Sequence, residues 1–267
     1  MKLFVSLRDN RRRIWALACF GLLSISVALA TTISRHSVGP CYPTQFAQIK
    51  YVVCEIDLHV YELRTFLLAA DGKPFGSFDR LRQATEDSTL AVAMNAGMFQ
   101  ETLLPVGLYI ENGKTESAPD LSNGTGNFYL KPNGVFFVRG RSAGILEMNK
   151  FLEENLSVDF ATQSGPMLVI DGQIHPKIAP DGVSRKIRNG IGVINEHTVI
   201  LAISNEPVSF GKFAKLFRNK FRCSNALYFD GAISSLYAPS VRRSDSRSEL
   251  GPIIAAIRRK DDFTPPP

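Results

Sequence analysis

Apolar and polar positions alternate along much of this chain, and the alternation predicts a protein built mainly from strands. Val, Ile, Tyr and Phe recur at short intervals over residues 46–69, which predicts two adjoining strands or one long bent strand. Compact apolar runs at residues 90–94 and 226–229 predict two further strands that are buried in the core. Both runs stop abruptly on a polar residue, Asn95 in one and Asp230 in the other.

Turn-forming pairs separate the extended runs and predict hairpins between them. Asn-Gly and Asp-Gly adopt tight hairpin turns readily, and Asn-Glu separates the apolar runs at residues 191–194 and 199–204. A short strand at residues 167–170 also ends on such a pair. We therefore expect turns at Asn112-Gly113, Asn133-Gly134, Asp171-Gly172 and Asn195-Glu196.

Two segments have helical periodicity. Residues 78–87 predict a short helix, and Ser209 is placed to cap a second helix that runs to about residue 222. Phenylalanines at positions 210, 213, 217 and 221 share one face of this second helix, so we expect that face to pack on the core. Together the elements predict a single mixed α+β domain with a strand-rich core and hairpins over residues 46–258. A linker is predicted at 31–45 and a disordered tail at 259–267.

The first 30 residues have the pattern of a targeting segment. Four arginines between positions 8 and 13 precede an uncharged, mostly apolar run at residues 14–30, which is typical of a signal peptide or an N-terminal membrane anchor. The Ala28-Leu29-Ala30 triplet supplies small residues for a signal peptidase and favours cleavage. In both cases the rest of the chain is expected in the periplasm or another extracytoplasmic space, and the membrane is contacted only through this segment if it is not cleaved.

Most of the positive charge belongs to this same segment. The formal net charge is +6, but five of the 31 Lys and Arg residues and only one of the 25 acidic residues lie within the first 30 positions. The remaining residues therefore carry a net charge of only +2. No long basic stripe with interleaved aromatic residues remains, so a nucleic acid is not expected as a partner.

The cysteines favour an oxidising compartment without specifying a metal. Cys19 lies in the targeting segment, which leaves Cys41, Cys54 and Cys223. A Cys41–Cys54 disulfide is one interpretation, and a small buried hydrophobic role for Cys54 is the other. No Cys/His spacing typical of zinc occurs. We predict no metal site and no cofactor, and a requirement for a divalent cation stays open.

Four buried runs end on small, flexible and polar residues, and these ends carry the candidate chemistry. If the ends converge, their glycines allow a ligand to approach the backbone while the polar groups supply donors, a cation and a base. Each pair also has a plain interpretation as an ordinary turn. The ends are Asn95 with Gly97, Ser164 with Gly165, Arg188 with Asn189, and Asp230 with Gly231, Ser234 and Ser235.

Other catalytic motifs are not matched. Ser164 lies in "TQSGP", which lacks the first glycine of the GxSxG nucleophile elbow, so a Ser164-dependent hydrolase is an alternative without further support. The chain has no GxxxxGK[ST] phosphate loop and no HExxH zinc motif.

Taken together, five blocks resemble a known family. The segments "MNAGMF", "KPNGVFF", "TQSGPMLVIDGQIHP", "RNGIGV" and "NALYFDGAISSLY" are similar, in order and spacing, to the signature blocks of the phosphodiester glycosidase domain family. The resemblance covers about residues 46–240. It implies a mixed α/β fold whose strand-end loops surround a polar pocket, and hydrolysis of a sugar phosphodiester or an envelope glycan.

The resemblance also implies roles for the residues that match. Asp230 is expected to act as general base or as nucleophile at the anomeric carbon, and Arg188 to hold the phosphate. Asn95 completes the predicted catalytic set. The residues expected to bind substrate are Gly97, Lys131, Ser164, Gly165, Asn189, Glu206, Gly231, Ser234 and Ser235, with Glu206 also a candidate second acid. Ala232 stands where the family usually has a second glycine, which motivates the alternative of a catalytically weak carbohydrate-binding protein.

Overall fold

A computed structural model describes residues 39–85 and 89–260 of the chain. The predicted signal peptide or anchor at 1–30 and residues 261–267 of the predicted tail lie outside the described residues. The chain divides into two compact units, Met1–Gly39 and Pro40–Pro267, and all the elements below belong to the second. Across residues 39–85 and 89–260, no helix has the length and apolar character needed to cross a membrane.

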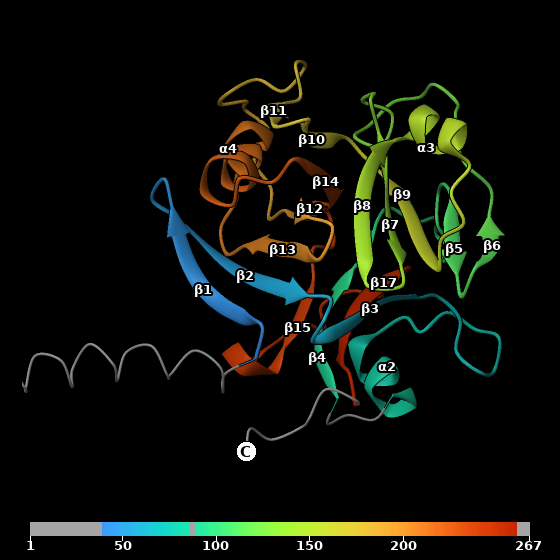
Figure 1. The fold of residues 1–267 in the computed structure, drawn as a ribbon. Helices are drawn as coiled ribbons and strands as arrows, with labels where there is room; N and C mark the ends of the chain where they lie inside the picture. The colour runs from blue at the N-terminus through green and yellow to red at the C-terminus, as the bar shows by residue number, and fades with distance from the viewer. Residues whose placement is uncertain (1–38, 86–88, 261–267) are drawn as a thin grey trace, which may run out of the picture. The chain divides into compact units, whose positions relative to one another are not determined.

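Strands dominate this unit and form three antiparallel sheets (Figure 1). The large sheet has the order β1 (Cys41–Phe46), β2 (Ile49–Asp57), β13 (Thr198–Ser204), β12 (Asn189–Asn195), β14 (Asn225–Asp230), β10 (Met167–Ile170) and β11 (Gln173–Ile174). The α+β class predicted from the sequence is confirmed, with β-structure in the majority.

Two smaller sheets complete the architecture. The first, called the C-terminal sheet, has the order β16 (Arg243–Ser244), β15 (Leu236–Ala238), β4 (Leu90–Asn95), β17 (Ile253–Arg258) and β3 (Tyr61–Phe66). The second, called the middle sheet, has the order β6 (Lys114–Ser117), β5 (Tyr109–Glu111), β9 (Phe160–Ser164), β7 (Gly134–Arg139) and β8 (Ser142–Glu147).

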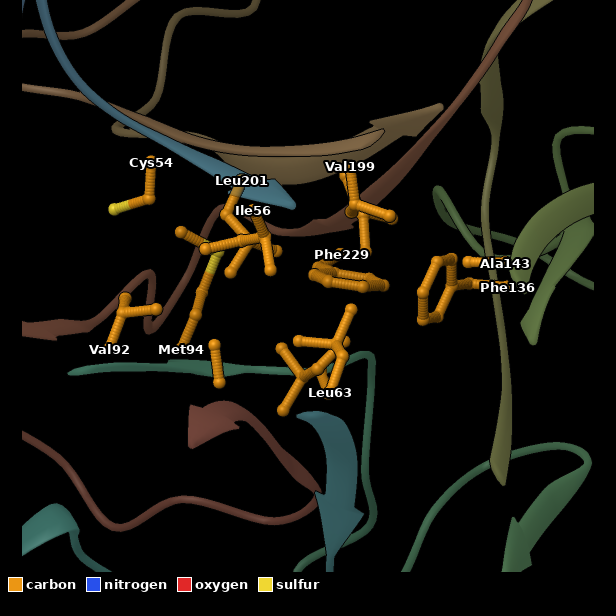
Figure 2. Packing of buried hydrophobic residues seen from close by; sticks show 14 of the residues in the cluster. Cys54, Ile56, Leu63, Val92, Met94, Phe136, Ala143, Val199, Leu201 and Phe229 are labelled. Carbon is orange, nitrogen blue, oxygen red and sulfur yellow. The ribbon is translucent and has the colours of Figure 1, made fainter. Parts of the chain in front are cut away.

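The main hydrophobic core receives side chains from all three sheets. Phe229 of the large sheet packs in one cluster with Leu63 of the C-terminal sheet and Phe136 of the middle sheet (Figure 2). Because successive side chains of a strand point to opposite faces, Val52 and Ile56 of β2 enter this core while Val53 packs in a second cluster on the other face of the large sheet.

Each sheet is covered on its second face by one short helix. Helix α4 (Phe210–Lys215), continued by the π-helical turn η2 (Leu216–Lys220), packs Phe213 and Phe217 against the large sheet. Helix α2 (Phe78–Ala84) packs on the C-terminal sheet, and α3 (Met148–Glu154) on the middle sheet. The Ser209 cap is confirmed, because its hydroxyl accepts a hydrogen bond from the Lys212 amide. The π-helical turn and α3 were not predicted.

Three of the four predicted hairpins are confirmed. Asn112-Gly113 joins β5 to β6 and Asp171-Gly172 joins β10 to β11, while the turn between β12 and β13 lies at Glu196-His197, one residue beyond the predicted pair. The first two turns use left-handed backbone angles at both central residues, as Asn-Gly and Asp-Gly pairs allow.

The fourth predicted turn is wrong. Strand β7 begins at Gly134, and its partners are β8 and β9 rather than the segment before Asn133. Asn133 is 2% exposed. The side-chain amide of Asn133 donates to the Phe128 carbonyl, and the backbone carbonyl of Asn133 accepts from the Met148 amide. Asn133-Gly134 therefore starts a buried strand. Its hydrogen-bonding groups find partners elsewhere in the chain instead of within a local turn.

The predicted linker also needs correction at its C-terminal end. Strand β1 starts at Cys41, inside the segment predicted to connect, and pairs along its length with β2. Pro43 is tolerated because β1 is an edge strand with no partner on its outer side. Cys41 and Cys54 face each other across this pair and form a disulfide, while Cys223 is free and buried.

Candidate active site

The polar ends of four strands meet at one place in the structure. The Thr162 hydroxyl near the end of β9 donates to the Ala96 carbonyl just after β4 (2.7 Å). The Ser164 hydroxyl at the end of β9 reaches the Phe229 carbonyl of β14 (3.4 Å). These contacts link the middle sheet to both other sheets, so the strand ends that the sequence singled out lie together.

A pair of buried asparagines fastens the cluster. The Asn189 amide donates to the side-chain oxygen (2.7 Å) and the carbonyl (3.1 Å) of Asn95. The same Asn95 oxygen accepts from the Ser235 amide (2.8 Å), and the Asn189 oxygen accepts from the Asp230 amide (3.0 Å). Asn95 Nδ2 is buried and has no hydrogen-bond partner among the described residues. The pair therefore joins β4, β12, β14 and the start of β15.

Asp230, the last residue of β14, is 8% exposed. Its Oδ1 accepts hydrogen bonds from the amides of Gly231, Ala232 (2.5 Å) and Ile233 (3.4 Å). Its Oδ2 has no hydrogen bond to any described residue. Burial raises the pKa of the Asp230 carboxyl, and the three amides oppose that rise. One oxygen is thus fixed by the turn, and the other makes no hydrogen bond within the described residues.

The serines that follow Asp230 hold the turn in place. The Ser234 hydroxyl donates to the Asp230 carbonyl (2.9 Å) and lies 3.0 Å from the Ile187 carbonyl. The Ser235 hydroxyl donates to the Ile233 carbonyl (3.0 Å). Both serines thus stabilise the loop between β14 and β15.

Position 231 requires glycine because a larger side chain would not fit there. A Cβ atom at this position would lie 2.2 Å from the Tyr228 hydroxyl and 3.5 Å from Arg188 Nη1. The backbone of Gly231 is not in the left-handed region, so conformational freedom is not the reason for the glycine. Tyr228 and Arg188 therefore pack closely against the turn at Gly231.

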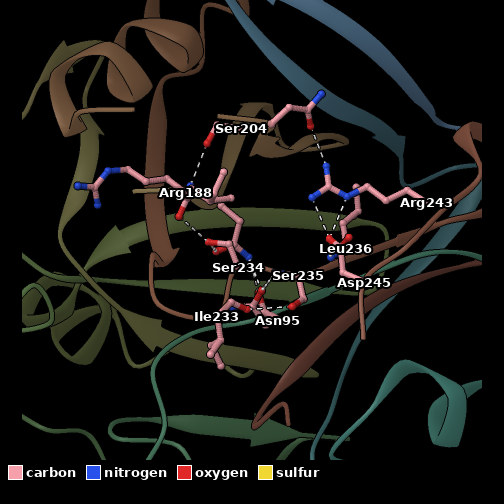
Figure 3. Close-up of polar contacts among 12 residues, drawn as sticks. Asn95, Arg188, Ser204, Ile233, Ser234, Ser235, Leu236, Arg243 and Asp245 are labelled. Atoms are coloured by element: carbon pink, nitrogen blue, oxygen red, sulfur yellow. Dashed lines mark hydrogen bonds and ion pairs between the residues drawn. The ribbon is translucent and has the colours of Figure 1, made fainter. Parts of the chain in front are cut away.

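Arg188 is fully buried, and its side chain leaves the strand on the side opposite the asparagine pair. Figure 3 shows it extending away from Asn95 and Ser234. Its Nη1 donates to the Tyr228 hydroxyl (3.1 Å), its Nε to the Val208 carbonyl (2.8 Å), and its Nη2 to the Ser184 carbonyl (3.0 Å).

The charge of Arg188 has no carboxylate partner among the described residues. The guanidinium stacks 3.6 Å from the Phe210 ring centre, an arrangement that partly stabilises a cation. Burial lowers the pKa of Arg188. A buried cation without an acidic partner is costly to keep, and this one lies close to the Asp230–Gly231 turn.

Lys131 and Glu206 make contacts outside the cluster. Lys131 Nζ donates to the Leu121 carbonyl (2.6 Å), in the loop that precedes β7. Glu206 accepts from the Lys50 amide (2.9 Å) at the start of β2, which is separated from β14 by β13 and β12. Among the described residues, no second carboxylate hydrogen-bonds within the cluster.

The two predicted glycines near Ser164 lie where backbones approach closely. Gly97 has a left-handed φ of 134°, and a Cβ there would lie 3.3 Å from Thr162 Oγ1. Gly165 packs against Asn133, where a Cβ would approach to 2.7 Å. Gly97 thus brings the segment after β4 against β9, and Gly165 brings the end of β9 against the start of β7.

Sequence reasoning missed Tyr228 as part of the site. This residue is buried, accepts from Arg188 and supports Gly231. The signal was available in strand alternation, because Tyr228 precedes Asp230 by two residues and so shares its side of the strand. An apolar run of four residues was instead treated as core throughout. Within residues 39–85 and 89–260, no group of three or more His, Cys, Asp or Glu side chains could hold a metal ion.

Comparisons with known proteins identify the family to which the chain belongs. A family model described as phosphodiester glycosidase matches residues 88–254, and the chain belongs to this family. An Escherichia coli (strain K12) relative, the uncharacterized protein YigE, is 38% identical over 169 residues, which are 63% of this chain and 66% of that protein. The alignment thus spans just under two thirds of that relative.

Two solved structures share the fold at low identity. A hypothetical protein from Synechocystis has a TM-score of 0.55 and 15% identity, covering 82% of this chain and 61% of that chain. The catalytic domain of zebrafish N-acetylglucosamine-1-phosphodiester alpha-N-acetylglucosaminidase, auto-inhibited by its pro-peptide, has a TM-score of 0.54 and 16% identity, covering 85% of both chains.

Proposed function

We propose that this chain is an exported hydrolase that releases a sugar from a glycosyl-1-phosphodiester. Membership of the phosphodiester glycosidase family supports the reaction class. The observation that carries the assignment to these residues is the position of Asp230. This buried carboxylate has one oxygen fixed by backbone amides, and it lies above a buried arginine that has no acidic partner among the described residues.

Asp230 supplies the carboxylate for the reaction. Positive charge develops at the anomeric carbon as the glycosidic bond breaks, and a nearby carboxylate stabilises it. Oδ2 then either accepts a proton from the attacking water or attacks the anomeric carbon itself. The first route inverts the anomeric configuration and the second retains it, so the stereochemistry of the product assigns the role.

The leaving group explains why one carboxylate is sufficient. A phosphate monoester leaves as an anion and needs no proton from a second acid, but its developing charge is stabilised by a cation. Arg188 provides that charge beneath the turn. Its nitrogens already donate to Val208, Tyr228 and Ser184, and of its five N–H groups one on Nη1 has no acceptor among the described residues and is the donor proposed for the phosphate. The substrate-binding roles of Lys131 and Glu206 stay predictions.

The substrate class follows from the same reasoning. The zebrafish relative is named for N-acetylglucosamine-1-phosphodiester, and we extend only the sugar-1-phosphodiester linkage to this chain. An envelope glycan that contains such a linkage fits an exported enzyme.

Two features of the chain support export. Residues 14–30 have the composition of a signal peptide or anchor. The Cys41–Cys54 disulfide is a bond that persists in oxidising compartments. Cell fractionation, with the mass of the mature chain, tests export and cleavage together. A full-length chain found only in the cytosol would contradict the proposal.

The activity is tested with purified residues 31–267 and a panel of sugar-1-phosphodiesters. We expect release of the free sugar by the wild type and its loss in Asp230→Asn, with anomeric configuration followed by NMR. Ser164→Ala tests the serine alternative: the proposal fails if this variant alone abolishes turnover. Saturable sugar binding without release from any diester would favour the carbohydrate-binding alternative that Ala232 motivates.

A further inference from the structure

A cavity of about 540 Å³ lies away from the candidate active site. Its floor is formed by Leu63, Val138 and Phe160, which are buried. It opens between β3, the edge strand of the C-terminal sheet, and the ends of β7 and β9 in the middle sheet. Its volume lies within the range of sites for small molecules, roughly 300–1,000 Å³.

Charged side chains surround this apolar floor. Arg64, Arg141 and Arg259 line the cavity together with Glu62 and Asp159. Glu62 is paired with Arg64 (2.7 Å), and Asp159 accepts from the Gly140 amide (2.6 Å). Both signs of charge therefore line the cavity, and Arg64 and Asp159 each already have one partner within it.

Two of these arginines have donors directed to no protein acceptor within the described residues. Arg64 Nε has no partner among the described residues but is itself buried, and Arg64 Nη2 donates to Glu62, so Arg64 contributes its charge to the cavity more than an open donor. Arg259 donates its Nε to the Leu58 carbonyl (3.2 Å), and no hydrogen bond or ion pair within residues 39–85 and 89–260 engages its two terminal nitrogens. Planar guanidinium groups with unused donors match a phosphate or carboxylate group.

The cavity and the candidate active site are at opposite ends of the same strands. Phe160 lines the cavity at the first residue of β9, and Ser164 belongs to the active-site cluster at the last. Four residues of strand span about 13 Å. A ligand in the cavity therefore binds apart from Asp230.

We propose that this cavity is a second binding site for a phosphate-bearing sugar. Arg64 and Arg259 bind the phosphate, and the apolar floor packs on the sugar ring. The carboxylates of Glu62 and Asp159 accept hydrogen bonds from its hydroxyl groups. The site does not depend on the proposed hydrolysis, since none of its residues belongs to the candidate active site.

The test is calorimetric titration of glucose 1-phosphate at fixed ionic strength, with glucose and inorganic phosphate titrated separately. We expect Arg259→Ala to weaken glucose 1-phosphate binding at least tenfold. Arg218→Ala is the matched control, because its Nε also donates to a backbone carbonyl at 3.2 Å, that of Gly172, at a site outside the cavity. This control is expected to change binding less than twofold. Arg64→Ala is a second variant at the same cavity.

Several results would overturn the proposal. Binding that survives in Arg259→Ala and is lost in Asp230→Asn would place the sugar phosphate in the active site instead. Inorganic phosphate binding as tightly as glucose 1-phosphate would reduce the cavity to a plain anion site. Because the readout is binding, a wild type that hydrolyses no diester leaves the test intact. Thermal unfolding of each variant identifies any loss that is due to misfolding.

Discussion

The same dipeptide, Asp-Gly, ends two strands of the large sheet with opposite consequences. Asp171-Gly172 joins β10 to β11 at the sheet edge, with Asp171 exposed and left-handed backbone angles at both residues. Asp230-Gly231 ends the interior strand β14, where Asp230 is buried. Gly172 in the first turn is needed for its left-handed backbone angle, and Gly231 in the second is needed because a side chain there would collide with Tyr228. The role of an Asp-Gly pair is therefore set by its burial and by the residues that pack against it.

The largest difference between the two turns is expected in activity. Asp230→Asn removes the ionised carboxylate while keeping its shape, so we expect the turnover number to fall by about 10²–10⁴-fold. Asp171→Asn, the matched change in the exposed turn, is expected to leave turnover within about twofold of wild type. Sugar release from the best diester of the panel measures both. Equal losses in the two variants would remove the distinction between the turns.

Replacing either glycine by alanine is expected to lower the unfolding free energy, but for different physical reasons. Gly231→Ala introduces a Cβ 2.2 Å from the Tyr228 hydroxyl, and such overpacking costs about 1–3 kcal/mol of unfolding free energy. Gly172→Ala meets no atom within 4 Å but has a φ of 74°, so about 1–2 kcal/mol is lost through backbone strain.

Removal of the Tyr228 hydroxyl separates the two causes. In a Tyr228→Phe background the added methyl of Gly231→Ala loses its 2.2 Å contact and keeps those with Lys186 Cβ (3.2 Å) and Arg188 Nη1 (3.5 Å), so its cost should shrink, while the cost of Gly172→Ala should not change. Urea unfolding of the single and double variants measures this. Strictly additive costs at Gly231 and Tyr228 would show that the glycine is needed for another reason.

The buried turn is also expected to make stability depend on pH. Burial raises the pKa of Asp230, so the folded state holds this proton more tightly than the unfolded chain does. Its contribution to the unfolding free energy is present in acid and declines as pH rises from about 4, the ordinary carboxyl value, through the raised pKa.

The comparison of wild type with Asp230→Asn isolates this contribution. Over that pH window the unfolding free energy should shift in favour of the variant, because asparagine has no proton to lose. Urea unfolding at closely spaced pH values provides the curve, and a difference that does not vary with pH would be contrary to expectation. Turnover by the wild type should fall on the acid side of the same window, since the reaction needs the ionised carboxylate.

The smallest effect is expected at Ala232. Its side chain is exposed and its amide already donates to Asp230. Ala232→Gly should therefore change turnover by less than about threefold and lower the unfolding free energy by about 0.5–1 kcal/mol through added freedom of the unfolded chain. A gain in turnover of tenfold or more would instead show that the methyl group restricts the substrate.

Local patterns predicted most of the strands and the elements of the site, but not their contacts. Alternation found β2 and β3, compact apolar runs found β4 and β14, and turn pairs found three hairpins. The fourth turn was wrong because Asn133 is held by long-range partners that no local pattern contains. The sequence raised the convergence of the strand ends only as a condition, and the structure brings Asn95, Ser164, Asn189 and Asp230 together while the Arg188 side chain points away from Asn95.

The direction of Arg188 could not be predicted from the residues alone. It precedes Asn189, and adjacent residues on a strand point to opposite faces. Sequence therefore placed both near the site without saying which one would meet Asn95. The support of Gly231 by Tyr228 depends on the fit of one hydroxyl beneath one turn, and that fit is set by packing.

The asparagine pair has a consequence for how the protein folds. Its hydrogen bonds join residues 94 positions apart, between Asn95 and Asn189, and 140 apart, between Asn95 and Ser235. Contacts of such high sequence separation form slowly, because a long loop must close before any stabilisation is gained. Asn95 is synthesised well before its partners Asn189 and Ser235, which lie in the C-terminal part of the domain. An incomplete chain thus has none of the geometry that surrounds Asp230, and activity, where found, reports that the whole domain has folded.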